Sequence, residues 1–365
     1  MSIQALIDEL YLEPVYGLSQ QEKDQKILPI INALTLKHEE CCEAYGNILK
    51  VRNDSSRIAD NIADVPFLPV RLFKTNLLSS VRESEQLKVL TSSGTTGQQV
   101  SRIVLDKDTS VYQTKTVVKI MQHFLGKDRL PMLIIDHPNV VKNRQSFSAR
   151  GAGILGMSNF GRSHTYILND DDMGIDWEKL VSFLEKYSGG PVLLFGFTFM
   201  VWKYLIQALE KTGRRINIPN GILIHSGGWK KLVEEAVDNE TFKSRLKAAT
   251  GINKVHNFYG MVEQVGSIFV ECEHGHLHAP IFSDVIIRNP LDWSEMPANE
   301  QGLVQVVSCL PLSYPGHSLL TEDLGVLLGE DDCPCGKKGR YFSVSGRLPK
   351  SEARGCSDTF QENRP

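Results

Sequence analysis

Apolar residues recur along this chain in two different patterns. The first part carries them at helical spacing, which predicts helices over Ile3–Leu10 and Gln25–Lys37. Farther along, short apolar runs alternate with amphipathic segments, as strands alternate with helices. We therefore expect a helical N-terminal region over residues 1–88 and an α/β core over residues 89–265.

The α/β core contains predicted strands and helices in turn. The apolar runs are Ile103–Leu105, Met132–Ile135, Val192–Phe195, Ile222–Ile224 and Val255–Phe258. The helical segments are Asp108–Leu125, Ser146–Met157, Trp177–Tyr187, Thr198–Lys211 and Asn239–Thr250. Because parallel strands need crossover connections, this alternation favours a mostly parallel sheet covered by helices.

Residues 266–345 lose the helical period, and short apolar runs are separated there by Gly, Pro and Asn turns. The predicted strands are Ile268–Val270, Asp284–Ile287, Leu303–Ser308, Val326–Leu328 and Tyr341–Val344. We expect a smaller antiparallel or β-barrel-like subdomain here, followed by a short tail over residues 346–365.

The composition narrows the class of protein. A chain of 365 residues is long enough for two domains, and its 41% of hydrophobic residues excludes a wholly disordered protein. The 40 basic residues are outnumbered by 43 acidic ones, so we expect no nucleic-acid partner, since a phosphate backbone attracts a basic excess. No apolar run approaches the roughly 20 residues of a membrane span, and no secretory signal begins the chain, so we expect a cytoplasmic location.

One loop has the composition of a phosphate-binding site. It directly precedes the predicted strand Ile103–Leu105 and consists of Ser92, Ser93, Gly94, Thr95, Thr96 and Gly97. Backbone amides and hydroxyls of such small residues can close around phosphate oxygens. The loop lacks the Gly-Lys-Ser/Thr of a Walker motif, and an ordinary Ser/Gly/Thr turn is the alternative.

This loop resembles the signature loop of the adenylate-forming superfamily, which includes the acyl-CoA synthetases, and further matches follow in the superfamily's order. The Tyr-Gly-x-x-Glu motif is matched by a segment that contains Phe258, Tyr259, Gly260 and Glu263. The ribose-binding Thr-x-Asp motif is matched by Thr321 to Asp323, and the hinge Gly-Arg pair by Gly346 and Arg347. The Gly-rich segment between the adenine and acyl pockets is matched by Ser226, Gly227 and Gly228. Four of these matches, the loop, Tyr-Gly-x-x-Glu, Thr-x-Asp and Gly-Arg, follow in order and are together far more specific than any one of them.

Each motif residue suits a role in binding ATP with Mg²⁺. Tyr259 can stack on adenine, Glu263 can hold the Mg²⁺ of the triphosphate, and Asp323 can accept from a ribose diol. Taken singly, Tyr259 could be a core aromatic, Glu263 a solvated helix residue and Asp323 a turn former. Many members carry a basic residue where this chain has Val100, which leaves phosphate charge to Arg102 and Arg347.

The resemblance implies a large N-terminal adenylate-forming domain over residues 1–345. Typical members continue after the hinge into a lid domain that supplies a catalytic lysine, whereas this sequence ends soon after Arg347. We therefore expect a chain that lacks the usual C-terminal lid.

The tail contains Arg-Gly-Cys-Ser around Cys356, and a cysteine near positive charge in a polar tail favours the thiolate. Together with the short C-terminus, this resembles the LuxE-type acyl-protein synthetases of bacterial bioluminescence. The resemblance implies that a fatty or other carboxylic acid becomes an acyl-adenylate, then a thioester on Cys356, and then passes to a reductase partner. A terminal cysteine without a role is the alternative.

Three other functions remain open. A phenylacetate-type aryl- or acyl-CoA ligase would share the body, although the short C-terminus argues against it. A non-catalytic, nucleotide-binding interaction protein is the second, and DNA binding through cysteines and histidines is a distant third. The acyl chain and the oligomeric state cannot be derived from the sequence.

The seven cysteines are an odd number, which favours metal binding or thiol chemistry over a disulfide framework. Cys272 and His278 on one segment and Cys333 and Cys335 on another could supply four sulfur and nitrogen ligands to a structural Zn²⁺. Three histidines compete for the fourth position. Free cysteines in turns with solvated histidines are the alternative.

Overall fold

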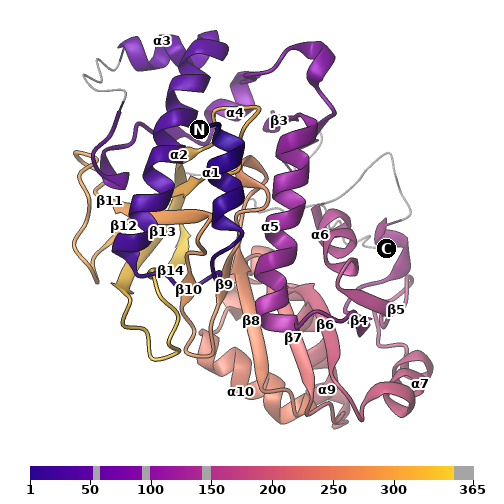
Figure 1. Cartoon of the computed structure of the whole chain (residues 1–365). Helices are drawn as coiled ribbons and strands as arrows, with labels where there is room; N and C mark the ends of the chain where they lie inside the picture. The colour runs from indigo at the N-terminus through magenta and orange to yellow at the C-terminus, as the bar shows by residue number, and fades with distance from the viewer. Residues whose placement is uncertain (52–57, 93–98, 142–148, 349–365) are drawn as a thin grey trace. The chain divides into compact units, whose positions relative to one another are not determined.

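The computed structural model describes residues 1–51, 58–92, 99–141 and 149–348 (Figure 1). The chain forms two compact units. Of the described residues, unit 1 comprises 1–51, 58–92, 99–123 and 260–348, and unit 2 comprises 124–141 and 149–259. The N-terminal helices thus share a unit with the β-rich segment, although the two differ in sequence pattern.

Unit 1 begins with helices α1 (Ile3–Leu10) and α2 (Gln20–Cys41), which pack on its strands (Figure 1). Ser2 and Ser19 accept backbone N–H groups at their N-termini, as serine does at many helix starts. Their apolar faces share one buried core with residues of the strands and of the segments next to them. The members of this core include Ile7, Leu10, Ile27, Ile31, Leu34, Phe282, Ile286 and Leu310. Other helices of unit 1 are α3 (Glu43–Val51), the single turn α4 (Leu72–Thr75) and most of α5 (Lys107–Leu125).

The strands of unit 1 run in the order β11-β12-β13-β14-β10-β9, and every neighbouring pair is antiparallel. Their bounds are β9 Phe269–Glu271, β10 Leu277–His278, β11 Ser283–Arg288, β12 Gln301–Ser308, β13 Ser318–Glu330 and β14 Arg340–Arg347. The short β1 (Leu68–Pro69) pairs in parallel with β13. The predicted antiparallel strands are confirmed.

Unit 2 contains a parallel sheet in the order β5-β4-β6-β7-β8. The strands are β4 Leu130–Ile134, β5 Gly161–Tyr166, β6 Val192–Phe197, β7 Gly221–Ser226 and β8 Lys254–Tyr259. The helices are α6 Ala149–Ser158, α7 Trp177–Tyr187, α8 Thr198–Val201, α9 Gln207–Thr212 and α10 Asn239–Thr250. This arrangement confirms the predicted parallel sheet with helical crossovers.

Two sequence predictions are wrong in detail. The strand at Ile103–Leu105 does not join the parallel sheet, because β3 (Arg102–Leu105) pairs antiparallel with β2 (Lys88–Thr91) as a separate hairpin. The predicted helix Thr198–Lys211 is interrupted by a π-helical turn at Trp202–Ile206.

Within the residues described above, no helix combines the length and the apolar character needed to cross a bilayer.

Candidate functional site

Three predicted site residues converge in unit 1 although they are far apart in the sequence. Asp323 on β13 pairs in register with Arg347 on β14, and Nε of Arg347 lies 3.1 Å from Oδ1 of Asp323. Glu263 lies in the 3₁₀ turn Val262–Gln264, and the charge of Arg347 acts on its carboxylate. The structure thus gathers the proposed Mg²⁺ ligand, ribose ligand and hinge arginine in one unit.

Glu263 is a buried carboxylate on a rigid backbone. The residue is only 7% exposed, and burial raises the pKa of its carboxyl group. The hydroxyl of Tyr314 donates to the Glu263 carbonyl at 2.9 Å. The next residue, Gln264, donates to the carbonyls of Val306 and Gly316 at 3.0 and 2.8 Å. A carboxylate fixed in this way suits a hard cation, because Mg²⁺ prefers oxygen ligands.

Two cations oppose the effect of burial on the pKa of Glu263. They are Lys74 and Arg347, and the Ser101 side chain acts in the same direction. Lys74 belongs to the short helix α4, so no periodicity in the sequence could have singled it out. It is a residue of this site that motif reasoning missed.

Ser92 closes the base of the predicted phosphate loop. Its N–H donates to the Ser101 carbonyl at 3.0 Å, and its hydroxyl accepts the Ser101 N–H at 2.8 Å. Because β2 and β3 flank these two residues, the loop is the connection of an antiparallel hairpin. The other loop residues, Ser93, Gly94, Thr95, Thr96 and Gly97, lie outside the described residues, as does Cys356.

In unit 2, the predicted Gly-rich segment follows the carboxyl end of a parallel strand. Ser226 ends β7 beside Phe258 of β8, and its hydroxyl donates to the Phe258 carbonyl at 2.8 Å. Gly227 has a φ of 83°, which favours glycine. Tyr259 ends β8 and is half-buried. Ligands bind at this edge of parallel sheets, so the position suits nucleotide or acid binding.

The two remaining motif glycines differ in the space around them. A Cβ on Gly228 would meet no atom within 4 Å, whereas a Cβ on Gly260, in unit 1, would lie 3.2 Å from Ile268.

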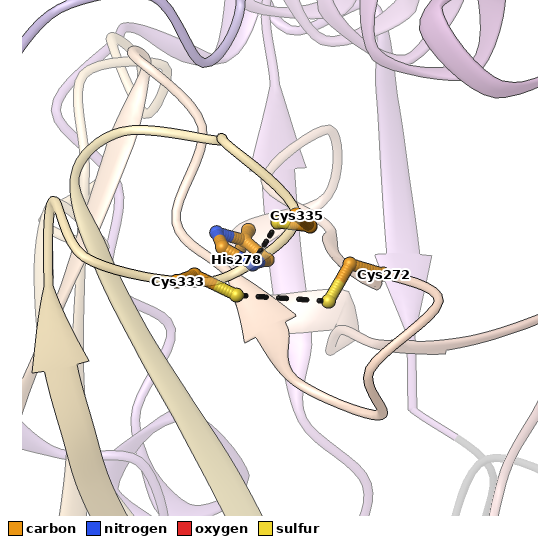
Figure 2. Close-up of side chains that lie close together, drawn as sticks. All are labelled: Cys272, His278, Cys333 and Cys335. Carbon is orange, nitrogen blue, oxygen red and sulfur yellow. Dashed lines mark hydrogen bonds between the residues drawn. The ribbon is translucent and has the colours of Figure 1, made fainter.

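The cysteines and the histidine predicted for zinc converge in unit 1 (Figure 2). The ligand atoms of Cys272, His278, Cys333 and Cys335 all lie within 4.8 Å of one another. Sγ of Cys272 is 4.0 Å from Sγ of Cys333, and Sγ of Cys335 is 3.3 Å from Nε2 of His278. Tetrahedral Zn²⁺ with bonds of about 2.3 Å separates its sulfur ligands by about 3.8 Å, so the donor set fits this ion.

A second histidine lies beside this Cys/His cluster. His276 is also close, because its Nδ1 lies 3.3 Å from Sγ of Cys333. Burial, with smaller effects of Lys337 and His276, lowers the pKa of His278 to about 3. A neutral imidazole is the form that binds a metal, so His278 is ready to act as a ligand.

A buried ion pair at the end of β4 had no signal in the sequence motifs. Nε of Arg150 lies 2.9 Å from Oδ2 of Asp136, and Nδ1 of the adjacent His137 lies 2.6 Å from Oδ1 of Asp170. The four residues come from three segments of unit 2, so only the fold brings them together.

A family model described as "Acyl-protein synthetase, LuxE" matches residues 2–364. The chain belongs to the LuxE acyl-protein synthetase family. This confirms the resemblance carried by the motifs and makes the protein an enzyme of the ligase class. A long-chain-fatty-acid–luciferin-component ligase of Vibrio harveyi is 21% identical over 362 residues, with 96% of this chain and 91% of the relative covered.

Solved structures with the same fold include a 2-hydroxyisobutyryl-CoA ligase. Its open conformation, in complex with 2-HIB-AMP and CoA, matches with a TM-score of 0.67 and 16% identity over 92% of this chain and 77% of that chain. A thioesterification state of the same ligase also gives a TM-score of 0.67, over 91% and 69% of the two chains. At this identity the likeness shows an α/β fold with a large sheet, as in adenylate-forming ligases.

Proposed function

We propose that this LuxE-family protein uses ATP to activate a carboxylic acid and then carries the acyl group on Cys356. The observation that carries the proposal is the convergence of Glu263, Asp323 and Arg347 in a chain of this family. In the first step a carboxylate oxygen bonds to the α-phosphorus of ATP. The bond from that phosphorus to the β-phosphate oxygen breaks, and pyrophosphate leaves with the electron pair.

The residues divide this task by chemistry. Asp323 accepts hydrogen bonds from the ribose hydroxyls, and Arg347, held beside it, contributes positive charge near the phosphates. Glu263 is the residue that would hold Mg²⁺, which neutralises charge on the triphosphate. Backbone N–H groups of the loop that starts at Ser92 donate to phosphate oxygens, and Tyr259 stacks on the adenine.

In the second step the Cys356 thiolate attacks the acyl carbonyl, a thioester forms, and AMP leaves. The tail starts next to the adenylation residues, because the N–H of Leu348 donates to the Glu322 carbonyl at 3.0 Å. A tethered thiol has a high effective concentration at such a site. The name of the Vibrio harveyi relative supports a fatty acid as substrate. A reductase partner as acyl acceptor is what the LuxE-type resemblance implies.

The test compares three variants with wild-type protein, in the presence of ATP, Mg²⁺ and a panel of fatty and aryl acids. Cys356→Ser should keep acid-dependent pyrophosphate exchange and lose the acyl-protein adduct, which mass spectrometry of peptides locates. Glu263→Gln should lose the exchange by about 100-fold, since its charge no longer fixes the cation. Cys41→Ser, at an exposed cysteine of α2, is the matched control. An adduct on Cys356→Ser, or efficient acylation of coenzyme A by a wild type that is not itself acylated, would support the CoA-ligase alternative.

We also assign a structural Zn²⁺ to the Cys/His cluster of Cys272, His278, Cys333 and Cys335. The cluster ties the turn between β13 and β14 to strand β10, and thus two segments that are far apart in the sequence. The four donor atoms close the coordination sphere, which is typical of structural rather than catalytic zinc.

A further inference from the structure

The Gly-rich segment of unit 2 is held at its first residue by hydrogen bonds. Ser226 ends β7, and its hydroxyl donates to the Phe258 carbonyl of β8 at 2.8 Å. The Ser226 carbonyl accepts a hydrogen bond from the Thr198 hydroxyl at 3.3 Å. Thr198 begins α8 directly after β6, so residues from both strands that neighbour β7 fix this end of the segment.

Trp229 holds the other end of the segment by aromatic packing. Its ring meets the ring of Trp202 edge-on, with 5.3 Å between centroids and 84° between planes. It meets the ring of Phe242 in the same way, at 6.3 Å and 82°. Trp202 and Phe242 are buried and lie nearly parallel, with 6.1 Å between their centroids. Because edge-to-face pairs are stabilised beyond the apolar area that they bury, these two rings anchor Trp229.

A π-helical turn carries one of the two anchoring rings. Trp202 opens the turn Trp202–Ile206, and the Gln207 N–H donates to the Trp202 carbonyl five residues earlier. Such turns are rare and are often found at functional sites. The Gln207 side chain donates to Oε2 of Glu235 at 2.9 Å, at the end of the 3₁₀ turn that follows Trp229. The helix that contains the π-turn therefore also holds the chain beyond the segment.

Only two residues, Gly227 and Gly228, separate the hydrogen-bonded end from the aromatic end. Both are exposed, and Gly227 has a φ of 83°. Glycines lose more conformational freedom than other residues when their backbone is ordered, which makes an unanchored pair costly to order on a ligand. Anchors on both sides restrict this freedom before a ligand binds and thus lower the cost of binding.

We propose that Trp229 is a positioning residue that preorganises the Gly-rich segment for binding of the acid and of ATP. The inference rests on the proposed function and on the motif match that puts this segment between the adenine and acyl pockets. Trp229 acts through the backbone of Gly227 and Gly228, not by contact with a ligand. If only the anchored conformation binds, the apparent affinity falls with the fraction of molecules in that conformation. The saturated complex is unchanged, so the loss of the anchor affects affinity more than turnover.

The experiment uses three substitutions at one position. Trp229→Ala removes the ring, Trp229→Leu keeps an apolar side chain without a ring, and Trp229→Phe keeps an aromatic edge. Trp177→Leu is the matched control, at another half-buried tryptophan of unit 2, which lies under Arg214 instead. Circular dichroism and thermal melting check that each variant is folded.

Three measurements are made on each variant and on wild-type protein. Acid-dependent pyrophosphate exchange gives the KM of the acid and the maximal rate. Calorimetry gives the dissociation constant of Mg-ATP. Hydrogen exchange followed by mass spectrometry reports how often the backbone of residues 227–232 opens, and it does not depend on any activity.

We expect Trp229→Ala and Trp229→Leu to raise the KM of the acid and the dissociation constant of Mg-ATP about tenfold, with a maximal rate within about threefold of wild type. Hydrogen exchange in the segment should become about tenfold faster in both. Trp229→Phe should stay within about threefold of wild type in every measurement, and Trp177→Leu should change none of them.

Two results would overturn the inference. One is a folded Trp229→Ala protein with the affinities and the hydrogen exchange of wild type. The other is a lower maximal rate with an unchanged KM, because a merely structural role lowers the fraction of active protein and leaves the affinity of the remainder intact. If wild-type protein shows no pyrophosphate exchange, the proposed adenylation fails, and Mg-ATP affinity together with hydrogen exchange then decides whether Trp229 anchors the segment.

Discussion

Asp284 on β11 is the anion at the centre of a buried charge cluster in unit 1. Its side chain is fully buried, and Oδ1 lies 3.3 Å from Nζ of Lys23 on α2. Oδ2 accepts a hydrogen bond from Gln20 at 2.6 Å and lies 3.9 Å from Nη1 of Arg340. This carboxylate therefore faces two cations and connects α2 to the sheet, while Arg340 also lies 3.6 Å from a carboxylate oxygen of Glu295 and of Glu330.

The structure predicts that the two members of the Lys23–Asp284 pair are not equivalent. Burial acts to raise the pKa of Asp284, yet Lys23 and Arg340 hold that pKa below its ordinary value. Asp284→Asn removes the negative charge that faces the buried Lys23 and leaves it only neutral acceptors, the Ala279 carbonyl at 3.4 Å and the new amide oxygen. Breaking a buried pair in this way costs about 3–5 kcal/mol of unfolding free energy.

Removal of the lysine should cost less. Lys23→Met leaves Asp284 with Gln20 and Arg340, and it removes a cation whose pKa burial already lowers. We expect Lys23→Met to lower the free energy of unfolding by about 1–2 kcal/mol, because Asp284 keeps its other hydrogen-bond partners.

Urea unfolding, followed by circular dichroism and analysed by linear extrapolation, measures both changes. Asp60→Asn, at an exposed carboxylate, is the control and should change the unfolding free energy by less than about 0.5 kcal/mol. If Lys23→Met destabilises the protein as much as Asp284→Asn does, the assignment of Asp284 as the shared anion is wrong.

Two further predictions concern metal and acid. Protein purified without chelator should contain about one zinc per chain. Cys333→Ser should lower both the zinc content and the melting temperature, whereas the control Cys41→Ser should change neither. Protein that contains no zinc, and whose stability Cys333→Ser does not change, would contradict the metal site. Burial lowers the pKa of His317 to about 3 and that of the stacked His38 well below its ordinary value. Because the unfolded chain binds protons at both histidines below about pH 6.5, their stabilising effect is complete above that pH and should fall by about 2 kcal/mol between pH 7 and 5.5. A His317→Gln variant that keeps the full pH slope, with exposed His164→Gln as the control, would refute this.

Local sequence determined the helices and the buried strands of unit 2. Helices α7 and α10 have the bounds that periodicity predicts, because an Asp at each N-cap accepts a backbone N–H and the apolar residues lie on one face. The strand β6 and the segment Ile222–Ile224 of β7 are apolar runs, which is typical of strands buried on both faces of a parallel sheet.

The chemistry of the motif residues could also be predicted from the sequence. Glu263, Asp323 and Arg347 stand in segments whose residue types and order match the superfamily, so they could be named before any contact was known. The four zinc ligands could be named from their residue types as well. The sequence could not choose among the histidines, because His276 and His278 lie two positions apart on the same segment, and the structure keeps both near the cysteines.

Contacts between distant segments were decided by tertiary structure alone. The edge strand β5 (Gly161–Tyr166) is rich in polar residues, because it pairs only with β4 and much of it stays exposed, so it had no apolar signal. The strand β3 pairs with β2 and not with the parallel sheet, a choice that the composition of β3 does not determine. Helix α4 lies against the sheet of unit 1 only because β1 pairs with β13 and Phe73 packs on Tyr314. Such contacts depend on the packing of surfaces far apart along the chain, and no local pattern of residues encodes their position.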